Sequence, residues 1–141
     1  MGVNLRNAEG YMDLTAYEAL MNIEREAKKV HSFRPVVYIC SPLSGNVEAN
    51  QEAARRYCRY AVDAGYVPVA PHLFFPQFMD DTDEEERNLA LFMDIVLLSK
   101  CAELWVFGGT ISKGMSIEIE KAKRKCKPVR YFTDTCKEVF A

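Results

Sequence analysis

The chain has 141 residues, 49% of them hydrophobic and 27% charged, a balance that predicts one folded, soluble domain rather than a disordered tail. Its 18 basic and 20 acidic residues give a net charge of −2, so no overall positive field favours nucleic acid as a partner. No apolar run approaches the roughly 18 residues of a membrane span, and no signal peptide opens the sequence, so we expect no membrane partner.

The cysteines bear on compartment and metal binding. There are five, scattered and without a Cys-x-x-Cys pair, which argues against a disulfide framework or a zinc site and predicts a cytoplasmic protein. Only Cys40, at a predicted strand end, is placed to touch a ligand. The chain has only two histidines, so a histidine-based metal centre has no support, and we expect no metal.

The first predicted element is a helix over about 14–30. Its apolar residues recur at helical spacing: Leu14, Tyr17, Leu20 and Met21. We interpret residues 1–34 as an N-terminal helical extension that packs on the sheet or on a second subunit. Residues 35–141 then form the α/β domain.

The α/β domain opens with a nearly all-apolar run, Val36–Cys40, typical of a strand buried on both faces. Turn residues follow it over 41–46. Asn46 or a neighbour is expected to cap a helix that runs through Ala64, and Gly65 suits its C-terminal stop.

The same alternation continues to the end of the chain. The predicted elements are a strand at 66–70, a loop at 71–78, a helix at about 84–101 preceded by an acidic run, a strand at 103–107, a helix at about 112–126 and a strand at 128–132. This order predicts a three-layer α/β domain with a parallel sheet of four to five strands in flavodoxin-like or Rossmann-like order.

In such sheets, ligands bind beyond the carboxyl ends of the strands. Three polar segments fall there: the loop after Cys40, the loop after Ala70, and residues 108–118. The last segment places small residues before a helix start, where backbone N–H groups suit an anion or a polar ligand. Ser112 is the expected cap, and Glu118 either faces a pocket or is an ordinary first-turn acid.

The loop at 41–46 matches neither a Walker A motif nor Gly-x-Gly-x-x-Gly. Its hydroxyls and the Gly45 N–H suit a sugar or a phosphate, or form only a capped turn. His72 either stacks on or hydrogen-bonds a base or sugar, or is a structural loop residue. No histidine is evidently placed to activate a serine or cysteine nucleophile. The nearby aromatics Phe74, Phe75 and Phe78 cover a ring-shaped ligand, join the core or form a subunit contact.

Asp94 interrupts the apolar face of its predicted helix, so its carboxylate needs a partner or a polar pocket. Two carboxylates, one acting as the nucleophile and the other as the general acid and base, are the minimum for cleaving a glycosidic bond through a covalent intermediate. Glu118 and Asp94 are the best-matched pair in the sequence.

The chain resembles the nucleoside 2-deoxyribosyltransferase-like superfamily, which includes the 2′-deoxynucleoside 5′-phosphate N-hydrolases. The resemblance lies in 37–42 as first strand and loop, in Asp94 on the helix before 103–106, and in 112–118 as that family's small-Gly-x-x-x-Glu helix start. It covers about Val36 to Phe132, and is especially close to a small uncharacterised bacterial and phage branch. Glu120 departs from it, since many relatives have glycine there.

The resemblance implies a site and a chemistry. Glu118 would attack the anomeric carbon, Asp94 would assist the leaving base or orient Glu118, and Tyr38 would hold Glu118 by a hydrogen bond. No cofactor is implied, and relatives complete their pockets from a neighbouring subunit, so a homodimer or larger homo-oligomer is expected. The residues expected to bind the sugar, a 5′-phosphate or the base are Cys40, Ser41, Pro42, Ser44, Gly45, Asn46, His72, Gly108, Ser112 and Gly114.

The leading hypothesis is therefore cleavage or transfer at the N-glycosidic bond of a (deoxy)nucleoside or its 5′-monophosphate. The alternative is a module that binds a nucleotide or a nucleotide-derived signal without turning it over. A purely structural or partner-binding domain is a weaker third interpretation, favoured only if Glu118 adjoins no pocket.

Overall fold

The computed structural model describes residues 14–30 and 33–140. The chain divides into two units, residues 1–34 and residues 35–141, and each is described by itself. The first unit contains the predicted helix, α1 (Leu14–Val30). No helix in the described ranges is both long and apolar enough to cross a membrane.

The second unit is built on a five-stranded sheet with the order β2-β1-β3-β4-β5. The strands are β1 (Val36–Cys40), β2 (Val67–Val69), β3 (Glu103–Phe107), β4 (Val129–Phe132) and β5 (Glu138–Val139). The first four are mutually parallel, and β5 runs antiparallel to β4. The predicted α/β class and flavodoxin-like order are confirmed, with a mixed rather than wholly parallel sheet.

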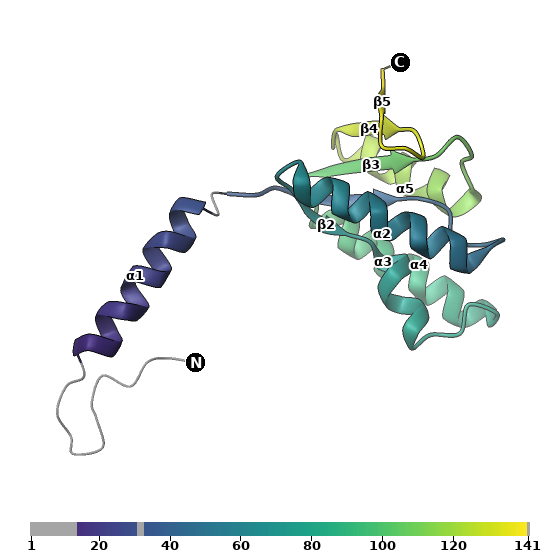
Figure 1. Ribbon diagram of the computed structural model, residues 1–141. Coiled ribbons are helices and arrows are strands. Elements are labelled where there is room, and N and C mark those ends of the chain that lie inside the picture. The colour runs from purple at the N-terminus through teal and green to yellow at the C-terminus, as the bar shows by residue number, and fades with distance from the viewer. Residues whose placement is uncertain (1–13, 31–32, 141) are drawn as a thin grey trace. The chain divides into compact units, whose positions relative to one another are not determined.

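Helices cover both faces of this sheet and make three layers (Figure 1). Alternate residues of β1 point to opposite faces, as strand geometry requires. Val37 and Ile39 pack in the core on the side of α2 (Val47–Asp63). Tyr38 packs in the core on the other side, with α4 (Glu84–Ser99) and α5 (Lys113–Arg124). A strand covered twice needs the nearly continuous apolar sequence that predicted it.

Local capping signals set where the helices begin and end. Asn46 accepts a hydrogen bond from the Ala49 N–H at the start of α2, and Ser112 accepts one from the Met115 N–H at the start of α5, both as predicted. Asp83 caps α4 in the same way. Gly65, after α2, has a φ of +92°, a left-handed conformation that glycine adopts without strain.

The segment predicted as a loop at 71–78 is mostly helical. It forms a short helix, α3 (Pro71–Phe74), followed by a 3₁₀ turn, η1 (Phe75–Gln77). Each begins with a proline near its first position, where a fixed φ favours a helical start and the missing N–H costs nothing. The rings of Phe74, Phe75 and Phe78 pack on one another, with centroids 5.0–6.0 Å apart.

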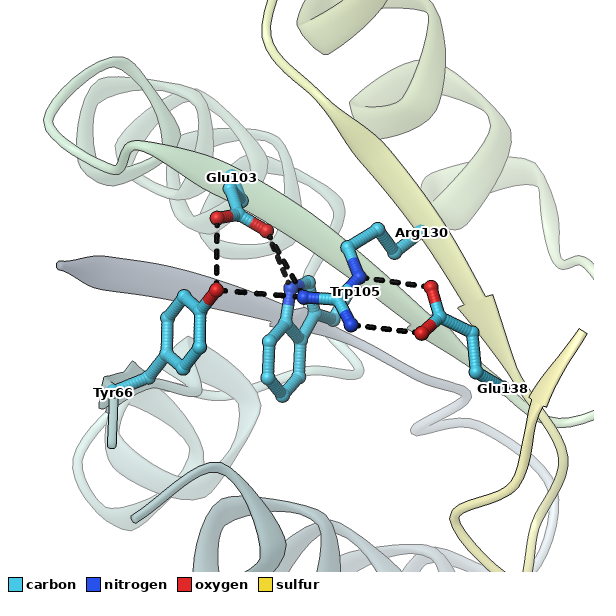
Figure 2. Close-up of polar contacts among 5 residues, drawn as sticks. All are labelled: Tyr66, Glu103, Trp105, Arg130 and Glu138. Atoms are coloured by element: carbon cyan, nitrogen blue, oxygen red, sulfur yellow. Dashed lines mark hydrogen bonds and ion pairs between the residues drawn. The ribbon is translucent and has the colours of Figure 1, made fainter. Parts of the chain in front are cut away.

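A polar network ties the edge of the sheet together near the amino end of β3 (Figure 2). The Arg130 guanidinium makes two 2.8 Å bonds to the carboxylate of Glu138 on β5, and lies 4.8 Å from the centre of the Trp105 ring. Glu103 accepts bonds from the Trp105 indole and the Tyr66 hydroxyl, at 3.0 and 3.1 Å. A bidentate, partly buried arginine is well suited to hold the short strand β5 in place.

We expect Arg130→Leu to lower the free energy of unfolding by about 1–3 kcal/mol, because it leaves two half-buried carboxylates without their cation. Arg124→Leu is the matched control. Its salt bridge to Glu120 joins side chains that are 68% and 62% exposed, and such pairs contribute only about 0–1 kcal/mol. Urea unfolding measures both, and equal losses would show that the network does not secure β5.

Candidate active site

A cavity of about 680 Å³ opens beyond the carboxyl ends of β1 and β2. Its walls come from the loop after β1, from α3 and η1, and from the facing sides of α4 and α5. The volume lies within the roughly 300–1,000 Å³ of small-molecule sites. Its place beside the junction of β1 with β2 and β3, where the strand order reverses, is the usual ligand position in this architecture.

Glu118 lines this cavity from the second turn of α5, with only 9% of its surface exposed. The Tyr38 hydroxyl, from the buried strand β1, donates a hydrogen bond to its carboxylate. Its second oxygen, Oε2, is buried and has no hydrogen-bond partner among the described residues. A buried polar atom without a partner is costly, so this oxygen is available to a ligand or to water.

Asp94 reaches the same cavity from α4, the helix that packs beside α5. Its Oδ1 is also buried and accepts no hydrogen bond from the described part of the chain. The predicted pair is therefore brought together at one pocket by two neighbouring helices. The possibility that Glu118 is an ordinary exposed acid is excluded by its burial.

Burial governs the charge of this pair, because a carboxylate loses its hydration there. Burial raises the pKa of Glu118 to about 8, although the bond from Tyr38 opposes the rise. Burial likewise raises the pKa of Asp94 to about 7. Both pKa values lie near neutrality, so each carboxyl is available there as a carboxylate or as a carboxylic acid.

Ser41 and His72 form a second pair on the cavity wall. The Ser41 hydroxyl lies 2.9 Å from His72 Nε2, although the residues are 31 positions apart. Burial lowers the pKa of His72 to about 4, so the imidazole is neutral at physiological pH. His72 therefore has a structural partner in Ser41 and also lines the cavity, and its contact with a base or sugar stays a prediction.

The other predicted binding residues divide into two groups. Ser44, Ser112 and Gly114 line the main cavity together with Ser41 and His72. Five do not line it: Cys40, Pro42, Gly45, Asn46 and Gly108. Cys40 is 1% exposed in the core, where its thiol points to the Met115 carbonyl. Pro42 and Gly108 line a separate cavity of about 170 Å³, and Asn46 caps α2.

Sequence reasoning missed several cavity residues on α4. Glu84, Arg87 and Leu91 line the pocket with Asp94, at spacings of three, four and three residues that place them on one helix face. Counting back from Asp94 in steps of three and four residues along the predicted helix would have identified them from the sequence. Among residues 14–30 and 33–140, no group of three or more His, Cys, Asp or Glu side chains is arranged to hold a metal ion.

This architecture is the fold of the 2-deoxyribosyltransferases. The structure resembles the 2-deoxyribosyltransferase of the psychrotolerant bacterium Bacillus psychrosaccharolyticus with a TM-score of 0.58 and 17% sequence identity, over 75% of this chain and 77% of that one. At that identity the likeness shows a shared fold.

Residues 35–132, most of the α/β unit, match the family described as Domain of unknown function (DUF7768), and the chain belongs to that family. A comparison with curated proteins gave no match. Glu120, the departure from the superfamily pattern, is exposed and bonds to Arg124 at 2.7 Å, so it lies outside the site.

Proposed function

We propose that this protein cleaves or transfers the N-glycosidic bond of a nucleoside or nucleoside 5′-monophosphate. The observation that carries the proposal is the pair of carboxyls, Glu118 and Asp94, each with a buried oxygen that has no partner among the described residues, at one ligand-sized cavity. The fold shared with a 2-deoxyribosyltransferase supports the same chemistry.

In the proposed reaction, an ionised Glu118 oxygen attacks the anomeric carbon and forms a glycosyl ester. The bond to the base breaks, and its electron pair leaves with the base nitrogen, which takes a proton from the Asp94 carboxylic acid. Water then attacks the ester in a hydrolase, or a second base attacks it in a transferase. Asp94 accepts the proton of that nucleophile, which restores the starting state.

Tyr38 acts on this reaction through Glu118. Its hydroxyl bonds to the Glu118 carboxylate and stabilises the charged form. The Oε2 atom, which has no partner among the described residues, is the oxygen proposed to attack. Burial keeps the pKa of Tyr38 above its ordinary value, so the phenol remains a donor throughout the physiological range. The nucleophile is thereby oriented without losing its reactive oxygen.

The direct test is incubation of the folded protein with a panel of deoxynucleosides and their 5′-monophosphates, with free base measured by chromatography. Adding a second, distinguishable base separates hydrolysis from transfer, because only a transferase returns a new nucleoside. No base release from any member of the panel would overturn the enzymatic proposal.

Asp94→Asn should lower turnover by about 10²–10⁴-fold without abolishing it, because the variant loses proton transfer but keeps the nucleophile. Substrates whose leaving group needs no proton should recover most of the loss, and p-nitrophenyl glycosides provide such a leaving group. An equal loss for both kinds of leaving group would instead assign Asp94 to orienting Glu118.

A binding module without turnover is the second candidate, and one observation favours it. With a pKa of about 8, Glu118 is largely a carboxylic acid at pH 7, which donates a hydrogen bond but attacks carbon poorly. If heating a complex returns the intact nucleotide, and Glu118→Gln binds it equally well, binding is the function.

We also propose a homodimer, as the superfamily resemblance implies. Exposed large apolar side chains support it: Phe74 and Phe78, in the segment of α3 and η1, are 57% and 60% exposed, and Phe92 on α4 is 65% exposed. Light scattering after size exclusion should give about twice the chain mass, and Phe92→Glu should shift it toward the monomer. A monomeric wild type at micromolar concentration would contradict this prediction.

A further inference from the structure

The charge of the main cavity points to a preference among its possible ligands. Besides Glu118 and Asp94, it is lined by four acids, the exposed Asp80, Asp81 and Glu84 and the half-buried Glu86. Arg87 and Lys113 are its only cations within the described ranges. Even with both buried carboxyls protonated, carboxylates outnumber cations two to one, and a narrow cavity concentrates their field.

Two hydroxyls that were expected to bind a phosphate each have a partner within the protein. The Ser41 hydroxyl is paired with His72, which is neutral because burial lowers its pKa to about 4. The Ser112 hydroxyl accepts the Met115 N–H, one of the free amides that a helix start would otherwise offer to an anion. The Ser112 O–H can still donate, so a role of Ser41 and Ser112 in binding a 5′-phosphate stays a prediction, and the preference proposed below rests on the charge of the cavity.

The two buried side-chain atoms of the described residues that have no hydrogen-bond partner are both carboxyl oxygens of this cavity. Glu118 is nine-tenths buried with Oε2 unpartnered, and Asp94 adds a second such oxygen. A sugar hydroxyl or a base N–H can bond to either oxygen in whichever protonation state it holds. A phosphate dianion can bond only to their protonated forms, and it would be repelled by the four acids of the cavity lining.

From these charges and contacts we propose that the site selects nucleosides with an uncharged or cationic 5′ substituent and discriminates against 5′-phosphates. The proposal rests on the function proposed above and narrows its substrate class. The discriminating residues are Asp81 and Glu84, which lie at the cavity and act on the ligand through their charge alone.

A ligand series that differs in charge at one atom tests this. Calorimetry on the wild-type protein compares the four common deoxynucleosides with their 5′-monophosphates, and adds 5′-amino-2′,5′-dideoxyadenosine. At low salt, the best-bound deoxynucleoside should have a Kd at least tenfold below that of its own monophosphate. The 5′-amino compound should bind at least as tightly as deoxyadenosine. Added salt should reduce the ratio of the two Kd values, because it screens the exposed charges of the cavity lining.

Two charge-removing variants locate the cause. The double variant Asp81→Asn with Glu84→Gln should reduce the ratio of the monophosphate Kd to the nucleoside Kd at least threefold. Glu85→Gln, which removes one carboxylate beside Glu84 in the first turn of α4 but outside the cavity lining, should not. If both variants reduce this Kd ratio equally, the proposed role of Asp81 and Glu84 is overturned.

The outcomes separate this inference from the proposed function. Tighter binding of the monophosphates, or binding of no compound in the panel, overturns the inference, whereas base release measured in parallel tests the function independently. If nucleosides bind more tightly than their monophosphates but no base is released, the proposed ligand preference is supported and the proposed catalysis is overturned. Base release mainly from monophosphates sustains catalysis and overturns the selection.

Discussion

Glu118→Ala should abolish base release, with a loss of at least 10³-fold, because no other described carboxyl is held by Tyr38 with a free oxygen in the cavity. The fold should survive, since the side chain ends in a cavity rather than in the apolar core. Chromatographic assay of base release, with circular dichroism to confirm folding, measures both effects.

The matched control for this variant is Glu120→Ala, two residues further along α5. Glu120 is exposed and forms a surface salt bridge to Arg124, so its removal should leave base release within about twofold of wild type. A Glu118→Ala protein with full turnover would reduce the likeness to a 2-deoxyribosyltransferase to fold alone. Intact-mass detection of a glycosyl adduct on wild type, absent from the variant, would identify the bond formed.

The wild-type protein should lose stability as pH rises from about 5 to 8. Glu118 has its pKa raised from an ordinary 4.5 to about 8, and Asp94 from 3.8 to about 7, both by burial. The unfolded chain releases these protons at lower pH than the folded one, so rising pH favours unfolding. The stabilisation is complete below the ordinary values and is lost as pH rises through the folded values.

The size of this effect follows from the same linkage. Each pKa unit of difference between folded and unfolded states corresponds to about 1.4 kcal/mol, so the Glu118 carboxyl alone contributes a few kcal/mol of pH-dependent stability. Glu118→Gln cannot ionise, and it should be more stable than wild type at pH 8.5 by that amount. The difference should shrink toward zero or reverse near pH 4.5.

Urea unfolding of wild type and Glu118→Gln across pH 4.5–8.5 measures this difference directly. Comparing the two proteins at each pH cancels the contribution of groups they share, including His72, whose lowered pKa makes stability fall at acid pH. Parallel curves would show that Glu118 titrates normally in the folded protein. The same titration should appear in catalysis, where turnover falls as pH drops below the pKa of the attacking carboxyl.

Much of the scaffold was predictable because its signals are local. The apolar runs at 36–40 and 103–107 predict doubly covered strands, and Asn46, Gly65 and Ser112 mark helix ends through bonds and dihedral angles within a few residues of themselves. The order of these elements alone indicates a parallel sheet with a site at its carboxyl ends.

Other elements depend on partners far along the chain. The strand β5 has two residues, too few for a periodic signal, and it is fixed by pairing with β4 and by the Arg130 bond to Glu138. The helical turns at 71–77 follow prolines, which are equally common in loops. Sequence pattern could not distinguish these outcomes.

The sequence by itself determined the fold class, the caps and the candidacy of Glu118 and Asp94. Only the tertiary structure decided that the buried Glu118 and the half-buried Asp94 lie at one cavity, where loss of hydration raises their pKa values, and that Ser41 is paired with His72 across 31 residues. The physical reason is that propensity and capping act over a few residues, whereas burial and charge are set by which distant segments the packed sheet brings together.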